Sequence, residues 1–160
     1  MGSKKYFLRK ARKYDLLVLF CWVNDPIVRQ SAFSTEDIPF QSHKQWFLQS
    51  LSSDIRKIFI LQKGDLPIGQ VRLEQKNDEW FIDYSIDAAW RGRGYGTKIL
   101  QLIEEKLPQD TVLVAEVKNT NVPSKKVFEN LGYKRMHNKK DNIMIYKKHV
   151  LYTRGRHTYI

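Results

Sequence analysis

The amino-acid sequence predicts a single α/β domain over residues 1–160, in which helices flank a mixed central β-sheet. Between residues 57 and 86, short apolar segments alternate with turn residues, as is typical of strands joined by hairpins. After Gly94, segments of helical length alternate with strand-like segments, as is typical of helix crossovers in a sheet. No internal repeat and no Pro/Gly/Ser-rich linker divides the chain, so one domain is expected.

The N-terminal third predicts one short strand followed by three helices. The strand is expected at residues 6–8. Asp15 is expected to cap a first helix, whose apolar side carries Leu16, Leu17, Phe20 and Cys21. Pro26 permits only a turn or a fresh helix start, so residues 25–29 predict a second short helix. Ser42 is the expected N-cap of a third helix that continues through residue 51.

The remainder of the chain predicts most of the sheet. Strands are expected at residues 57–61, 67–74 and 80–86, with Ile82 and Tyr84 on one face of the last strand and Asp83 on the other. A helix over residues 94–107, a strand over 112–117 and a helix over 121–131 follow. Residues 133–136 and 142–146 are expected to close the sheet as an antiparallel pair.

The composition excludes several classes of protein. With 42% hydrophobic and 28% charged residues, the chain is neither disordered nor a membrane protein by composition. It has no apolar run near the ~20 residues of a membrane span and no apolar signal-peptide core, so a soluble cytosolic protein is expected. The lone cysteine, Cys21, excludes an intramolecular disulfide and a cysteine-based zinc cluster, and its apolar surroundings predict that it is buried.

The charge balance is strongly basic. Lys and Arg number 28 against 17 Asp and Glu, which gives a formal net charge of +11, and many of the basic residues lie in residues 4–13 and 134–156. Such an excess favours anionic partners, whether nucleic acid, an anionic membrane surface or phosphate-bearing small molecules. A merely solubilising surface would give the same count, so charge alone does not choose among them.

A glycine-rich turn, Arg91-Gly92-Arg93-Gly94-Tyr95-Gly96, lies between a predicted strand and a predicted helix. The first N–H groups of a helix have no partner within it and carry partial positive charge, so such a turn binds phosphate readily. The glycine spacing differs from the G-x-G-x-x-G dinucleotide fingerprint, and the Gly-Lys-Ser/Thr of a P-loop is absent. A pyrophosphate site of another kind is therefore predicted.

Two motifs, in order along the chain, resemble the GNAT family of N-acetyltransferases. The turn from Arg91 to Gly96 resembles the family's R/Q-x-x-G-x-G/A motif, which holds the pyrophosphate of acetyl-CoA. The segment Asn121-Val122-Pro123-Ser124, followed by Phe128 and Gly132-Tyr133, resembles the family's N-x-x-[AS]-x-x-x-[YF]-x-x-x-G-[FY] segment. The resemblance covers nearly the whole chain. It implies a mixed sheet in which a splayed pair of strands holds acetyl-CoA, with no metal.

The resemblance also implies which residues contact the coenzyme. Backbone N–H groups near Ile86 and Asp87 would hold the pantetheine arm and the thioester carbonyl, and the turn would bind the diphosphate. Transfer would be direct, in a ternary complex without an acyl-enzyme. The implied coenzyme-binding residues are Ile86, Asp87, Arg91, Gly92, Arg93, Gly94, Tyr95, Gly96, Thr97, Asn121, Ser124 and Phe128.

Three residues are candidates for the catalytic base. Asp83 and Glu116 are carboxylates on predicted central strands, and the imidazole of His43 titrates near neutral pH. Solvent exposure or a structural ion pair is the alternative for each carboxylate. For His43, contact with substrate is expected first and a role as base second.

The proton donor to the departing thiolate is a second open point. Many members of the family carry a tyrosine for this purpose where this chain has Phe128. Phe128 has no hydroxyl, and it is expected to pack in the core or against the coenzyme. Tyr133, Ser124 or a water would then supply the proton, or the thiolate would leave unaided.

The N-terminal third carries a narrower resemblance. Residues 22–29, Phe33 and residues 43–47 resemble the acetyltransferases of flagellin-sugar pathways, which acetylate the 4-amine of a nucleotide-linked 4-amino-4,6-dideoxy sugar en route to pseudaminic acid. Under this hypothesis Arg29 meets a phosphate. For Trp22, packing in the core is the alternative to contact with the substrate. The expected substrate-binding residues are Trp22, Asn24, Arg29, His43 and Trp46.

Three functions follow, in descending order of expectation. The first is a cytosolic acetyl-CoA-dependent N-acetyltransferase that acts on a nucleotide-activated amino sugar. The second acetylates a protein N-terminus, as ribosomal-protein acetyltransferases do, or a polyamine or antibiotic amine. The third is a basic nucleic-acid-binding domain that keeps the fold without catalysis, which the paired coenzyme motifs disfavour. No membrane partner is expected, and the sequence leaves oligomerisation open.

Overall fold

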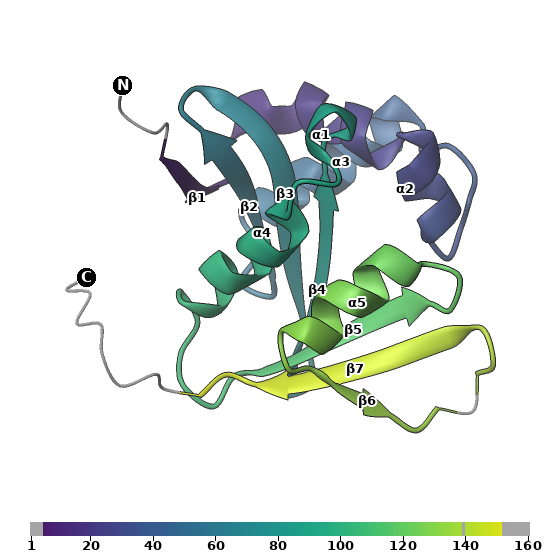
Figure 1. The fold of residues 1–160 in the computed structure, drawn as a ribbon. Helices are drawn as coiled ribbons and strands as arrows, with labels where there is room; N and C mark the ends of the chain where they lie inside the picture. The colour runs from purple at the N-terminus through teal and green to yellow at the C-terminus, as the bar shows by residue number, and fades with distance from the viewer. Residues whose placement is uncertain (1–4, 139, 152–160) are drawn as a thin grey trace.

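The computed structural model describes residues 5–138 and 140–151. They form one seven-stranded mixed sheet with the strand order β1-β2-β3-β4-β5-β7-β6 (Figure 1). Neighbouring strands are antiparallel except for β4 and β5, which are parallel. The strands are β1 (Tyr6–Lys10), β2 (Arg56–Lys63), β3 (Leu66–Lys76), β4 (Glu79–Ile86), β5 (Val112–Lys118), β6 (Lys134–Met136) and β7 (Ile143–His149).

Helices cover both faces of this sheet. Alternate residues of β2 show the two layers, since Ile58 and Ile60 pack with α1 and α3, whereas Phe59 and Leu61 pack on the side of α4 and α5 (Figure 1). The helices are α1 (Leu16–Val23), α2 (Pro26–Ser31), α3 (Phe40–Leu51), α4 (Tyr95–Glu104) and α5 (Val122–Asn130), with short 3-10 helices η1 (Lys13–Asp15) and η2 (Ala88–Trp90).

The two parallel strands of the sheet are paired only at their N-terminal ends. There residues 79–81 of β4 lie opposite residues 112–114 of β5. Beyond Phe81, β4 remains paired with β3, and β5 remains paired with β7, so the two strands diverge toward their C-terminal ends (Figure 1). This divergence, hereafter the splay, is the splayed strand pair that the family resemblance implies, and the predicted fold class is confirmed.

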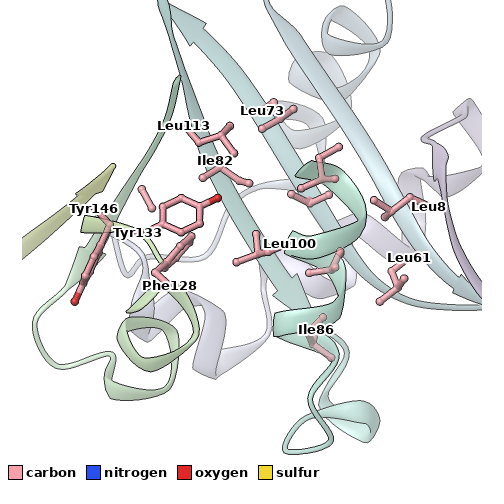
Figure 2. Close-up of a cluster of buried hydrophobic side chains, with 14 of the residues drawn as sticks. Leu8, Leu61, Leu73, Ile82, Ile86, Leu100, Leu113, Phe128, Tyr133 and Tyr146 are labelled. Carbon is pink, nitrogen blue, oxygen red and sulfur yellow. The ribbon is translucent and has the colours of Figure 1, made fainter. Parts of the chain in front are cut away.

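The larger hydrophobic core lies between the sheet and helices α4 and α5 (Figure 2). Ile99 and Ile103 of α4 are fully buried because they recur on one face of the helix. Phe128 of α5 is only 2% exposed, and its ring meets the rings of Tyr84 and Tyr133 edge to face. The expectation that Phe128 packs in the core is confirmed.

The buried side of α1 differs from the prediction. Cys21 is exposed and Leu17 is 65% exposed, whereas Leu19 and Trp22 are buried. All eight residues of α1 are apolar, so the helix has no polar side that would identify the buried face from the sequence. The predictions that Cys21 is buried and that Leu17 faces the core are wrong.

Capping in the N-terminal third also differs from the prediction. Helix α3 begins directly after Pro39, so Ser42 lies inside its first turn and is not the N-cap. Asp15 is the N-cap residue of α1, but its side chain does not bond to that helix. Its carboxylate instead pairs with Arg9 at 2.8 Å and accepts a hydrogen bond from the N–H of Arg12 at 2.7 Å.

Membrane and metal features are absent from the part of the chain that the structure describes. Within residues 5–138 and 140–151, the helices lack the length and apolarity needed to cross a bilayer. In the same residues, no three His, Cys, Asp or Glu side chains gather as metal ligands would. Arg154 and Arg156, which belong to the basic C-terminal segment, lie outside the described residues.

Candidate functional site

The glycine-rich turn between β4 and α4 forms an open site at the start of the helix. Gly92 and Gly94 have φ angles of 72° and 82°, in the left-handed region, and Gly94 is the N-cap of α4. A β-carbon at either glycine would meet no heavy atom within 4 Å, so the space beside them is open. No side chain caps α4, so the N–H groups of its first turn are available to an anion. This geometry fits a diphosphate.

Gly96 contributes to packing. It lies in the first turn of α4, and a β-carbon there would lie 3.1 Å from a ring carbon of Tyr84 on β4. Glycine therefore allows the helix to approach the strand with the Tyr84 ring between them. Tyr95 and Thr97, the neighbouring predicted coenzyme residues, lie in the same first turn, and the Tyr95 hydroxyl accepts a hydrogen bond from Lys63 at 3.2 Å.

The two arginines of the turn have different surroundings. Arg91 pairs with Asp25 at 3.0 Å, and its Nε donates to the carbonyl of Ile86 at 2.9 Å. Its guanidinium is thus engaged between α2 and the end of β4. Arg93 is exposed and lies over the ring of Trp90 at 5.3 Å. The geometry therefore favours Arg93 over Arg91 as the arginine that meets a phosphate.

The N-terminus of α5 lies across the splay from β4. Asn121 caps this helix, because its side-chain oxygen accepts a hydrogen bond from the N–H of Ser124 at 3.3 Å. The Ser124 hydroxyl lies 3.2 Å from the hydroxyl of Tyr84 on β4. A hydrogen bond thus joins the strand to the helix. The sequence predicts roles for Asn121 and Ser124, but it places Tyr84 only on one face of a strand, with Ile82.

Asp87 directly follows β4 and connects three elements. Its carboxylate accepts hydrogen bonds from the N–H of Ala89 at 2.9 Å and from the indole of Trp22 at 2.8 Å. Its own N–H donates to the carbonyl of Ile68 at 2.9 Å. The N–H that sequence reasoning assigned to the pantetheine arm at Asp87 is therefore engaged with β3. Trp22 is buried, so the core alternative for this residue is confirmed.

The two candidate carboxylates lie on the face of the sheet opposite α4 and α5. The Asp83 side chain is 60% exposed and pairs with Arg72 at 3.5 Å. Arg72 also lies over the ring of Trp46, 5.4 Å from its centre. Glu116 is exposed on β5. The structure therefore places Asp83 and Glu116 on the two diverging strands, one on each side of the splay.

His43 lies in an aromatic cluster between α1 and α3. It is 4% exposed, and its ring centre lies 5.6 Å from that of Phe20 and 6.2 Å from that of Phe47. Burial lowers the pKa of His43, and a hydrogen bond with the backbone of Leu16 opposes this only in part, so the imidazole is neutral at pH 7. This burial favours a structural role over the expected contact with substrate.

Asn24 and Arg29 hold the loop that follows α2. The Asn24 side chain accepts from the N–H of Ile38 at 2.7 Å and donates to its carbonyl at 2.9 Å. Arg29 donates to the carbonyl of Val23 at 2.6 Å and to the carbonyls of residues 34 and 36. Both predicted substrate-binding residues are therefore engaged in structural hydrogen bonds.

A hollow of about 470 Å³ lies where β5 ends beside the β6–β7 hairpin. Three basic residues and one acidic residue line it together with amide and apolar side chains. The lining residues are Asn119, Arg135, Met136, His137, Asn138, Lys140, Asp141, Ile143 and Met144. Asn119 directly follows β5 and the other lining residues lie in or between β6 and β7, so the hollow lies at the C-terminal end of β5, on its β7 side. The sequence does not reveal this hollow, because its residues come together through the pairing of strands and do not form a continuous motif.

Comparison with known proteins places this geometry among related folds. Residues 5–134 match the family model of the acetyltransferase (GNAT) domain. A domain from Methanocaldococcus jannaschii is 24% identical, with a TM-score of 0.78 over 91% of this chain and 98% of that one. A spermidine N-acetyltransferase from Vibrio cholerae, solved with CoA and spermine, is 14% identical, with a TM-score of 0.79 over 92% and 96%.

A third solved structure, RimL, is a ribosomal L7/L12 α-N-protein acetyltransferase in complex with CoA. It is 14% identical, with a TM-score of 0.78 over 92% of this chain and 95% of that one. No curated protein matches the sequence. At these identities the solved structures show that the fold is shared.

Proposed function

Because this chain belongs to the GNAT family and is an acetyl-CoA-dependent N-acetyltransferase, we propose that it acetylates the amine of an anionic small molecule, the 4-amine of a nucleotide-linked 4-amino-4,6-dideoxy sugar. Transfer is direct. The amine nitrogen attacks the thioester carbonyl, so that a C–N bond forms and the C–S bond breaks. The exposed Cys21 lies on α1, outside the splay, and takes no part.

The basic lining of the hollow at the C-terminal end of β5 is the observation that carries this proposal. Arg135, His137 and Lys140 line it against a single acidic residue, Asp141. Basic side chains favour binding of the diphosphate of a sugar nucleotide. Its sugar amine would extend from there past the C-terminal end of β5 into the splay.

The opposite acceptor class, a polycation, is disfavoured because carboxylates on the sheet face opposite α4 and α5 are already neutralised in ion pairs. Asp83 pairs with Arg72, and Glu79 pairs with Lys147. A polyamine or aminoglycoside binds best to several carboxylates that are not already neutralised. Glu116 takes part in none of the ion pairs between described residues, so it is the carboxylate best able to accept the proton of the attacking amine.

A thiol-release assay with acetyl-CoA and a panel of amines tests the proposal. The panel contains a UDP-linked 4-amino-4,6-dideoxy sugar, N-terminal peptides, spermidine and an aminoglycoside. We expect turnover with the sugar nucleotide alone. Arg135→Ala should raise the KM for the sugar nucleotide and leave the KM for acetyl-CoA unchanged. Turnover of a peptide or polyamine instead would keep the acetyl-transfer chemistry and contradict the proposed acceptor.

A further inference from the structure

The residue at position 128 cannot protonate the thiolate that leaves during acetyl transfer. Phe128 has no hydroxyl, and its ring is buried among Tyr84, Tyr133 and Tyr146. We propose that Tyr84, on β4, donates the proton to the departing sulfur, supported by its hydrogen bond with Ser124. This inference rests on the acetyl-CoA-dependent activity and is independent of the identity of the acceptor.

Tyr84 is placed at the splay by both of its neighbouring helices. Its hydroxyl lies 3.2 Å from Ser124 at the N-terminus of α5, so the side chain reaches from β4 to α5. Its ring lies against Gly96 in the first turn of α4, where a β-carbon would come within 3.1 Å. The phenol therefore lies between the two helix N-termini that the family motifs assign to acetyl-CoA.

The tyrosines deeper in the core are unsuited to this role. The hydroxyl of Tyr133 points into the cluster (Figure 2), where burial and the nearby carboxylate of Glu104 raise its pKa. Glu104 is eight residues along α4 from Gly96, which is about 12 Å at 1.5 Å per residue. The Tyr133 hydroxyl thus lies near the opposite end of the helix. The Tyr146 hydroxyl donates to Glu129 at 2.7 Å and points away from the cluster.

The remaining described tyrosines lie outside the splay. The Tyr95 hydroxyl accepts a hydrogen bond from Lys63 of β2, and its ring packs against Tyr6 of β1. Tyr14 is 66% exposed beside Arg9. Among residues 5–138 and 140–151, Tyr84 is therefore the tyrosine whose hydroxyl bridges β4 and α5.

The surroundings of Tyr84 keep its phenol protonated until the C–S bond breaks. Burial raises the pKa of Tyr84, the Ser124 hydroxyl opposes this shift, and the nearby Asp83 adds to it. As the C–S bond breaks, the electron pair passes to sulfur, which takes the proton from the Tyr84 oxygen. Ser124 donates a hydrogen bond to the phenolate, and solvent returns the proton. The proton released by the amine leaves separately, through the base.

Binding measurements test this role without any acceptor. Titration calorimetry would compare CoA with desulfo-CoA, in which hydrogen replaces the thiol group, for the wild type and for Tyr84→Phe. The variant keeps the ring that packs against Gly96 and Phe128. We expect the wild type to bind CoA roughly two- to tenfold more tightly than desulfo-CoA, as one hydrogen bond to sulfur provides. Tyr84→Phe should abolish that preference with little change in the affinity for desulfo-CoA.

Tyr133→Phe is the matched control, since it removes a second buried phenol and should keep the preference for CoA. With an accepted amine, Tyr84→Phe should lower kcat about 10²-fold and leave the KM for acetyl-CoA within about twofold, as for loss of a general acid. Equal loss of affinity for both ligands, or an unchanged preference in Tyr84→Phe, would show that Tyr84 only packs. A wild type that binds neither ligand would overturn the premise of acetyl-CoA use.

Discussion

Gly94 and Gly132 share a backbone conformation and differ in location. Both have φ of 82°, and a β-carbon at either would meet no heavy atom within 4 Å. Only Gly94 begins α4, at the predicted anion site, whereas Gly132 follows the C-terminal end of α5. Substitutions at these two glycines therefore separate the loss of folding free energy caused by a left-handed backbone from the effect on coenzyme binding.

We expect Gly94→Asp to raise the KM for acetyl-CoA at least tenfold, because a carboxylate would stand where the N–H groups of α4 attract a diphosphate. Gly132→Asp should lose a similar free energy of unfolding, about 1 kcal/mol, and keep its KM. Steady-state kinetics and urea unfolding measure the two effects. A KM that rises equally in both variants would contradict the assignment of the turn.

His43 makes stability depend on pH in a defined direction. Its pKa in the folded state is lowered from 6.5 by burial, so the unfolded chain binds a proton there more readily. Its contribution is therefore complete above about pH 6.5 and is lost as the pH falls through the lower pKa of the folded state. We expect the free energy of unfolding to fall between about pH 7 and pH 5 more steeply for the wild type than for His43→Gln. Parallel slopes in urea titrations would refute this.

At the level of elements, α2 is stabilised mainly at its N-terminus. This helix has six residues and no buried side chain, so packing alone does not fix it. Asp25 caps it by accepting from the N–H groups of Ile27 and Val28, and it also pairs with Arg91. Burial alone would raise the pKa of Asp25, but the hydrogen bonds from Arg91 and the backbone outweigh it and hold that pKa below its usual value.

Two substitutions at Asp25 separate these contributions. Asn remains a good N-cap and removes the charge, whereas Ala removes both the cap and the ion pair. We expect Asp25→Ala to lose about 1 kcal/mol more free energy of unfolding than Asp25→Asn, whose loss reflects a partly exposed ion pair worth roughly 0.5 kcal/mol. Thermal or urea unfolding measures both. Equal losses would show that capping contributes nothing to α2.

Elements with a strong pattern could be predicted from the sequence. The alternation of Ile82, Asp83 and Tyr84 identifies β4, and the apolar stripe of α4 identifies its buried face. The buried side of α1 could not be predicted, because apolar residues surround the whole helix. Helix α3 starts two residues before Ser42, since the extended backbone of Pro39 provides the boundary without a side-chain cap.

The site was predictable where one segment forms it and hidden where distant segments meet. The turn from Arg91 to Gly96 is continuous, so its motif predicts an anion site. The engagement of Arg91 depends on Asp25, which comes from another helix. The role proposed for Tyr84 depends on Ser124, 40 residues further along the chain. Such pairings follow from the packing of elements, which a linear pattern does not contain.

The whole molecule carries a net charge of +11, and this should control how quickly an anionic substrate is captured. We expect kcat/KM for acetyl-CoA to fall severalfold between about 0.05 M and 0.3 M salt, as screening shortens the range of attraction to below about 10 Å. kcat should change little, because the bound complex is already formed. Stopped-flow or steady-state assays measure both constants. Steeply salt-dependent binding of duplex DNA in the same range would instead favour a nucleic-acid partner.

The splay also has a consequence for the lifetime of the free protein. From Ile82 onward, the side of β4 toward β5 has no strand partner, so two inner edges with backbone N–H and C=O groups face each other within one sheet. A ligand with peptide-like amides can complete these edges, and amide hydrogen exchange there should slow when it binds. Ligand binding adds RT ln(1 + [L]/Kd) to the free energy of unfolding. The folded enzyme should therefore resist unfolding better when acetyl-CoA is abundant than when it is scarce.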